Sequence, residues 1–227
     1  MGLRPGALED PGVILGDPRL EARALRAARV FIATVPGVAP GALRRCSLHW
    51  SATAYGWARE RAAQGLALPY TVVVDRVAPG DEALVAGMSA AVNARELSLD
   101  LTANVDYCAS VRGRNSHGVA VSISAMADAR PSAFGEAPID GALVEFLCAA
   151  AGALCAAYGI DARVPEACYT HAEAALWDGY FGTGEEERWD LGVLEEADVD
   201  VKALAALAPR TGDRLRERIA VYAARLT

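Results

Sequence analysis

The run Leu68-Pro69-Tyr70-Thr71-Val72-Val73-Val74-Asp75-Arg76-Val77 decides the fold class of this chain. Its centre is a β-branched segment, and Pro79-Gly80 closes it with a turn signal, which together predict a strand. The segment lacks polar alternation, and a strand of that kind is buried on both faces of its sheet. We therefore predict an α/β fold: a mixed central β-sheet flanked by helices on both faces.

The rest of the chain alternates strand and helix patterns around this run. Residues 87–116 show no periodicity, and so long a loop in a compact domain is often functional. Further strands are predicted at 44–50, 118–126 and 167–170, and helices at 53–64, 138–158 and 172–178. One or two amphipathic helices are expected within 201–226.

We predict two parts, an N-terminal extension at 1–40 and a main domain at 41–227 that includes the C-terminal helices. The extension is rich in Pro, Gly and Arg around one helix, which Asp17-Pro18 begins because Asp caps a helix and Pro fits its first turn. The loose apolar face of that helix consists of Leu20, Leu25, Ala28 and Val30.

Composition limits the classes of partner and compartment. The formal net charge of −7 disfavours nucleic acid, whose phosphates demand a basic face. The apolar stretch 146–160 is shorter than a membrane span and predicts a buried helix instead. The N-terminus shows no signal-peptide pattern, so we expect synthesis in the cytoplasm.

The five cysteines show no Cys-x-x-Cys pair and no regular spacing. This pattern predicts free, mostly buried thiols in a reducing compartment. Cys46 lies three residues before His49, and Cys168 three before His171, so on a strand each pair points to opposite faces. The two cysteines are therefore poor ligands for a metal held by the histidines. A Cys-His hydrolase with Cys108 as nucleophile is an alternative without a local signature.

His49 and His171, two of only three histidines in the chain, stand at the ends of predicted strands. Asp190 follows in Arg188-Trp189-Asp190. Two imidazoles and one carboxylate are a sufficient ligand set for a catalytic zinc that keeps one position open. For Asp190 alone, a loop carboxylate or a helix cap is the alternative.

Five motifs occur in a characteristic order between residues 44 and 194. They are Leu48-His49-Trp50-Ser51-Ala52-Thr53, Tyr70-Thr71-Val72-Val73-Val74-Asp75-Arg76, Arg114-Asn115-Ser116-His117-Gly118-Val119-Ala120-Val121-Ser122, Tyr169-Thr170-His171-Ala172-Glu173 and Arg188-Trp189-Asp190. The set resembles the zinc-dependent N-acetylmuramoyl-L-alanine amidases, whose fold is shared with peptidoglycan recognition proteins, and looks closest to phage and prophage forms. The resemblance implies a zinc groove at one sheet edge.

It further implies that His49, His171 and Asp190 bind Zn²⁺ and that the chain is a hydrolase. Arg188 stands where the family usually has lysine, and its guanidinium could stabilise the oxyanion of the tetrahedral intermediate. The alternative is a surface arginine paired with Glu185, Glu186 or Glu187.

Two further residues are candidates for catalysis. Tyr70 matches a family tyrosine that orients the water or the intermediate, although it could equally be a core aromatic at a strand start. Many cytoplasmic recycling members use a glutamate base where this chain has Ala120, so that mechanism does not carry over. Glu173 is the candidate substitute, or else a cap for the helix that begins beside it.

Asn115 and His117 are candidates for substrate binding, with a turn residue as the alternative for His117. The expected reaction is hydrolysis of the amide between N-acetylmuramic acid and L-alanine in peptidoglycan. We expect a phage or prophage lysis enzyme that acts on the cell wall if it is released or injected. The alternatives are a cytoplasmic amidase that recycles muropeptides and a non-catalytic peptidoglycan-binding module.

Overall fold

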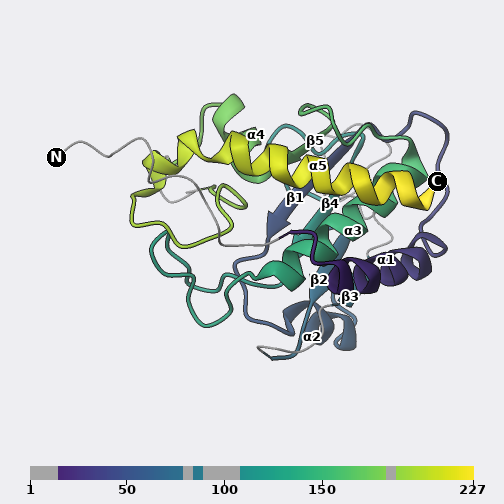
Figure 1. Cartoon of the computed structure of the whole chain (residues 1–227), viewed down its shortest axis with the longest axis horizontal. Coiled ribbons are helices and arrows are strands. Elements are labelled where there is room, and N and C mark those ends of the chain that lie inside the picture. The colour runs from purple at the N-terminus through teal and green to yellow at the C-terminus, as the bar shows by residue number, and fades with distance from the viewer. Residues whose placement is uncertain (1–14, 79–83, 89–107, 183–187) are drawn as a thin grey trace.

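A five-stranded sheet in the order β3-β2-β4-β1-β5 organises the molecule (Figure 1). The computed structural model describes residues 15–78, 84–88, 108–182 and 188–227. β3 runs antiparallel to β2, whereas the other four strands are parallel to one another. The strands are β1 (Arg45–Trp50), β2 (Val72–Asp75), β3 (Leu84–Met88), β4 (Gly118–Ile123) and β5 (Cys168–Thr170).

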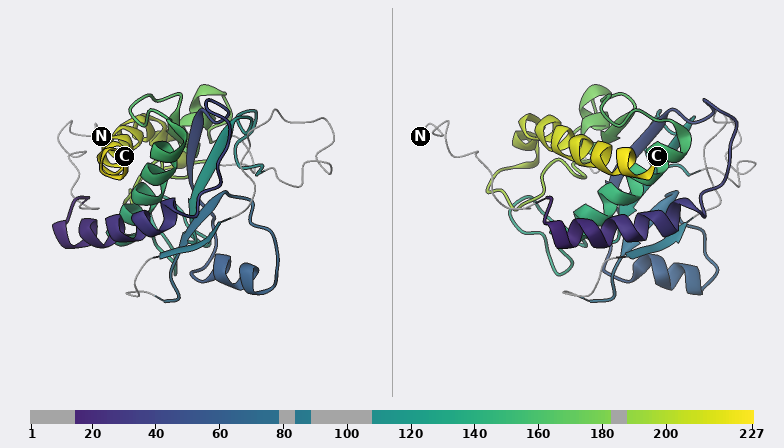
Figure 2. Two further views of the ribbon diagram at one scale, coloured as in Figure 1. Left: turned by 90° about the vertical axis from the view of Figure 1, so that its right-hand side faces the viewer. Right: turned by 45° about the vertical axis from the view of Figure 1, so that its right-hand side comes forward.

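Helices pack against both faces of this sheet, which confirms the predicted α/β class. α1, α3 and α5 lie on one side, and α2 lies on the other (Figure 2). The helices are α1 (Pro18–Ile32), α2 (Trp57–Ala63), α3 (Gly141–Tyr158), α4 (His171–Trp177) and α5 (Ala208–Leu226), with a 3₁₀ helix η2 (Val201–Ala206) before α5.

The valine run of β2 shows why both faces are covered. Val72 and Val74 belong to the main core around α3, whereas Val73 points to the opposite face and packs with Ala58 of α2. All three valines are fully buried. A buried valine contributes about 1.5–3 kcal/mol relative to an exposed one, so the run stabilises both layers.

α3 is the central core helix. Asp140 caps it by accepting a hydrogen bond from Leu143 N, and its carboxylate also pairs with buried Arg76 at 2.7 Å. Over its full 18 residues, α3 is long and apolar enough to cross a membrane. The stretch 146–160, on which the sequence-based prediction rested, is shorter than a membrane span. However, 72% of α3 is buried inside the fold, and the prediction of a buried helix is confirmed.

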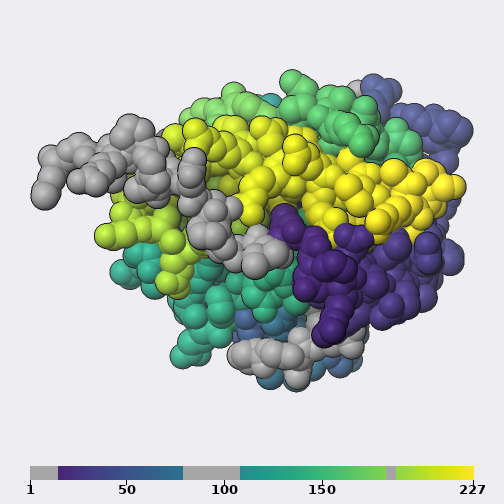
Figure 3. Space-filling model, viewed as in Figure 1, coloured from purple at the N-terminus to yellow at the C-terminus, as the bar shows by residue number. Residues whose placement is uncertain are grey.

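α1 and α5 cover the outer side of α3 and form one continuous surface (Figure 3). α5 approaches so closely that a Cβ added to Gly152 would lie 2.6 Å from Cβ of Tyr222. The Arg218 guanidinium joins the layers by binding Glu21 of α1 and buried Glu145 of α3. The helix of the N-terminal extension is therefore part of the same packed core.

Local details differ from the predictions where long-range contacts decide them. α2 begins at Trp57 rather than 53, because the Asp75 carboxylate accepts hydrogen bonds from Gly56 N and Ala58 N and fixes the first turn there. Val30 was expected on the apolar face of α1 but is 73% exposed. β3 was not predicted, and the rest of the predicted loop up to residue 107 lies outside the described residues.

Candidate metal centre and its pocket

Strand alternation separates a packed face of the sheet from a polar one. Leu48 and Trp50 of β1 point into the α3 core, so Ser47 and His49 point to the opposite face. The pairing of β1 with β4 places Ser122 beside His49 on that polar face. The sheet thus delivers the first histidine to the side that α3 does not cover.

The imidazole of His49 is fully buried and its tautomer is fixed by neighbouring groups. Nε2 lies 3.1 Å from Oγ of Ser47, and that hydroxyl donates onward to the Val119 carbonyl. We assign the proton of His49 to Nε2, since a Ser47 hydroxyl that donates to the carbonyl accepts from His49. Nδ1 therefore keeps its lone pair, and no described group makes a hydrogen bond with it.

His171 is the first residue of α4, directly after edge strand β5. Thr170 caps this helix and forms a capping box with Glu173, which holds the turn in place. Nδ1 of His171 lies 3.1 Å from Oδ2 of Asp190. The Asp190 carbonyl in turn accepts from Ala172 N, so the loop is fixed to α4 by its backbone.

The three predicted ligands meet at one point. Oδ2 of Asp190 also lies 3.5 Å from Nδ1 of His49, and the two imidazole rings meet edge to face with centroids 4.8 Å apart. One ligand atom from each residue lies within 4.8 Å of the others, so the group could hold a metal.

The charge states of His49 and Asp190 fit a cation. Burial lowers the pKa of His49 to about 4, although Asp190 opposes the shift. Burial also acts to raise the pKa of Asp190, but the charge and hydrogen bond of His171 hold it well below its ordinary value. A neutral imidazole and an ionised carboxylate are the forms that bind metals. Together with the lone pair of His49 Nδ1, this donor set fits zinc.

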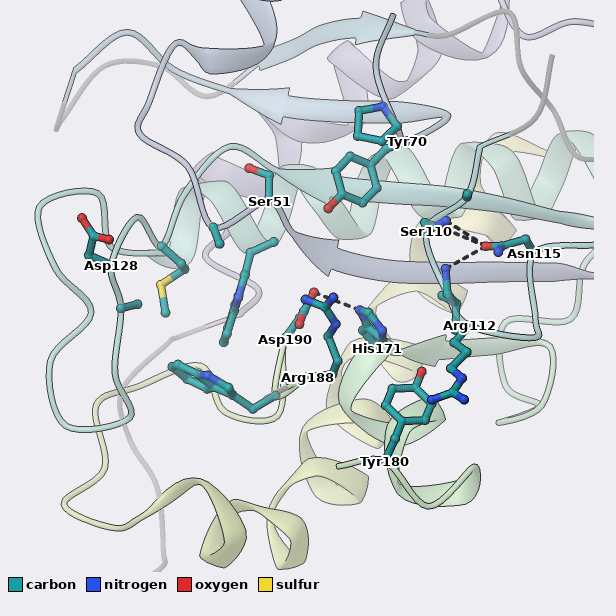
Figure 4. A pocket seen from close by; sticks show the side chains of 18 residues that line it. Ser51, Tyr70, Ser110, Arg112, Asn115, Asp128, His171, Tyr180, Arg188 and Asp190 are labelled. Atoms are coloured by element: carbon teal, nitrogen blue, oxygen red, sulfur yellow. Dashed lines mark hydrogen bonds and ion pairs between the residues drawn. The ribbon is translucent and has the colours of Figure 1, made fainter. Parts of the chain in front are cut away.

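A pocket of about 940 Å³ opens above the centre, and His171 and Asp190 lie on its wall. Its volume lies in the range of small-molecule sites. Tyr70 and Arg188 both line the pocket (Figure 4). One side of the centre is buried in the sheet and the other faces this open space. Among the described residues, the pocket reaches the edge of the sheet only through His171, which directly follows β5.

Tyr70 lines the pocket and points its hydroxyl into it (Figure 4). Its ring also packs against the cluster of Ala58, Leu68 and Val73, and its centroid lies 5.2 Å from that of His49. The two interpretations of this residue are thus compatible. Burial raises the pKa of its phenol, so the group stays protonated and can donate a hydrogen bond.

Arg188 is exposed and lines the pocket (Figure 4), where its positive charge acts on His49 and Tyr70. Its place on the wall of the pocket leaves the predicted oxyanion role as a prediction. The alternative partners Glu185, Glu186 and Glu187 lie outside the described residues.

Glu173 does not reach the pocket. Both of its carboxylate oxygens bind the buried guanidinium of Arg216, and one also accepts from Thr170 N. The capping interpretation is therefore confirmed. The role of general base finds no support, because the carboxylate is engaged on the side of the helix that faces Arg216.

Asn115 and His117 occupy different surroundings. Oδ1 of Asn115 accepts from the backbone of Ser110 and Val111, and the residue lines the pocket through the loop that it organises. Nδ1 of His117 lies 2.9 Å from the Ala42 carbonyl, and the residue is not part of the pocket wall. His117 is thus placed as a turn residue with a positive φ of 56°.

The pocket residues missed in the sequence include two charged side chains and a tyrosine. Arg112 stacks over the ring of Tyr180 at 5.9 Å, and both line the pocket, as does Asp128. Arg112 stands one residue before Gly113, whose φ of 70° marks a tight turn, and that turn signal was available in the sequence. Cys108, in contrast, is buried and absent from the pocket wall, which leaves the Cys-His alternative without geometric support.

Fold and site together define an α/β protein whose sheet carries a buried His/His/Asp group able to hold a metal below an open pocket. Comparisons of the chain with protein-family models, curated proteins and solved structures found no match.

Proposed function

We propose that the protein is a zinc-dependent amidase that hydrolyses the bond between N-acetylmuramic acid and L-alanine in peptidoglycan. One observation carries the proposal: His49, His171 and Asp190 converge, and His171 and Asp190 line the wall of an open pocket. Three protein ligands with a fourth position left open are typical of catalytic zinc sites, whereas structural sites are closed by four. When bound, zinc would polarise the scissile carbonyl and activate water.

The residues of the chain would position the substrate and stabilise charge. Arg188 on the wall of the pocket offers a permanent positive charge to the carbonyl oxygen as it becomes an oxyanion. The protonated phenol of Tyr70 points into the same space and can donate a second hydrogen bond there. Asp190 holds the ring of His171 in place through its 3.1 Å contact.

The position of Ala120 supports a mechanism without the glutamate of recycling amidases. Ala120 pairs with Ser47 and points to the polar face, where a longer acidic residue would approach the centre. The alanine is buried, and Glu173 is engaged with Arg216. Residue 120 has no carboxylate, and that of Glu173 does not reach the pocket. We therefore assign proton transfer to neither residue.

The substrate would be an acidic peptide on an amino sugar. Arg112, Tyr180 and Asn115 line one side of the pocket, away from Asp128. The guanidinium of Arg112 offers a positive charge to the carboxylates of a stem peptide. The open shape of the groove suits a polymer, which favours the wall-lysing form of the activity over recycling.

Three substrates would test this proposal with the zinc-loaded protein. The proposed enzyme releases peptides with a free N-terminal L-alanine from intact sacculi, as read by mass spectrometry. Cleavage of soluble anhydro-muropeptides without release from sacculi would indicate the recycling enzyme. Sedimentation with sacculi without cleavage of either substrate would indicate a binding module and contradict the proposal.

A further inference from the structure

A second cluster of metal-binding side chains lies on the opposite face of the same two strands. Cys46 of β1 and Cys168 of β5 are direct partners in the parallel pairing, and Cys155 of α3 lies over them. Their three sulfur atoms lie within 4.8 Å of one another. Each residue is at most 1% exposed, and all three are free thiols.

This thiol cluster is separate from the histidine centre. Cys46 and Cys168 point into the core around α3, whereas His49 points to the polar face. In the part of the chain that the structure describes, no His, Asp, Glu or fourth Cys joins the three sulfurs in a metal-binding group. The prediction that these cysteines do not serve the histidine centre agrees with this placement.

The donor set determines which ion would fit. Thiolates select soft ions such as Cu(I), while zinc in structural sites takes four ligands in a tetrahedron. Three sulfurs in an apolar core offer neither a fourth protein ligand nor contact with solvent. We propose that Cys46, Cys155 and Cys168 bind one Cu(I) ion in a three-sulfur site.

Binding requires the loss of the thiol protons. The guanidinium of Arg216 donates to the Cys168 carbonyl at 3.0 Å and places a positive charge on that side of the cluster.

Bound Cu(I) would join α3 to β1 and β5 directly behind the histidine centre. The two faces of the sheet would then sort metals by chemistry, with a soft ion among the sulfurs and a harder one between imidazoles and carboxylate. The inference does not depend on the proposed amidase activity, because it concerns different side chains and a different ion.

The test uses the full chain, reduced, unfolded and refolded without oxygen in the presence of Cu(I) as its acetonitrile complex. The ion is present during refolding because the three cysteines are buried in the folded protein. After removal of loose metal with a Cu(I) chelator, copper per chain and sulfur coordination by X-ray absorption are measured. The variants are Cys155→Ala and Cys168→Ser, with Cys148→Ala as the matched control, since Cys148 is buried in the same helix outside the cluster.

We expect about one copper per chain, bound by sulfur only, in the wild type, in Cys148→Ala and in His171→Ala. The two cluster variants should lose it while they still bind zinc at the histidine centre, which shows that they fold. Equal copper in cluster variants and control would overturn the proposal. Nitrogen or oxygen ligands on the copper would also overturn the proposal, and so would a wild-type protein that retains no copper. Both of these results are obtained from the wild-type protein alone.

Discussion

The carboxylate of Asp190 lies 3.1 Å from Nδ1 of His171, although 19 residues separate them in the chain. Residues 183–187, within that interval, lie outside the described part, yet the two ends meet through a second contact, from Ala172 N to the Asp190 carbonyl. The backbone contact places the carboxylate and the histidine ring on the same side. Together with His49 they form the donor set on which the functional proposal depends.

Replacing one imidazole should remove the metal. In His171→Ala we expect zinc content to fall from about one per chain to near zero, because two protein ligands remain where catalytic zinc takes three. The measurement is metal analysis after dialysis. The matched control is His117→Ala, which removes a histidine that contacts the Ala42 carbonyl outside the pocket. If His117→Ala loses as much zinc as His171→Ala, the ligand assignment is wrong.

The hydroxyl of Ser47 should raise the affinity of the site for zinc without binding the ion itself. It accepts from Nε2 of His49, and removal of such a partner typically weakens metal affinity by about 10–100-fold. We expect that loss in Ser47→Ala, measured by competition with a zinc chelator. Ser124→Ala is the control, because this buried hydroxyl has no hydrogen-bond partner among the described residues. Unchanged affinity in Ser47→Ala would show that the tautomer of His49 is fixed in another way.

Arg188 should act on the rate and not on the metal. Removing one oxyanion donor typically lowers kcat by about 10²–10³-fold, and we expect this loss in Arg188→Ala with full zinc content. The control is Arg163→Ala, another exposed arginine, which does not line the pocket. Loss of zinc in Arg188→Ala, or an unchanged rate, would contradict the oxyanion role.

Glu173 should matter for stability and not for chemistry. Its carboxylate balances buried Arg216, and breaking such a pair costs about 3 kcal/mol at the low end of the range, which applies here because Asp213 remains as a second partner. We expect Glu173→Gln to lower the free energy of unfolding by that amount, measured with denaturant, while activity per folded molecule is retained. Exposed Glu166→Gln is the control and should change neither quantity. A folded Glu173→Gln protein that binds zinc but has lost activity would restore the base role.

The fold class could be predicted because local sequence carried it. The valine run of β2 has the composition of a doubly covered strand, and the apolar positions of α3 gave a buried helix. β3 was missed, and the start of α2 was misplaced. The carboxylate of Asp75, in strand β2, fixes the start of α2 by accepting hydrogen bonds from its first turn. Asp75 lies 19 residues after Gly56, so the residues next to the helix start do not reveal this contact.

The group that could hold a metal was predictable because few residue types bind metal and only three histidines were available. The role of Glu173 was not, since its partner Arg216 lies 43 residues away on α5. Arg112 and Tyr180 come from separate loops that only the fold brings together. Side chains whose role depends on one distant partner are thus the part of the site that sequence patterns leave out.

The most direct test of the central claim follows one protein sample through removal and return of its metal. The zinc-loaded protein is incubated with purified sacculi, then stripped with a chelator, and then restored with one equivalent of zinc. The account predicts release of peptides that begin with L-alanine, loss of release after stripping, and recovery on restoration. Equal release from the stripped protein, or no release from the zinc-loaded one, would contradict it.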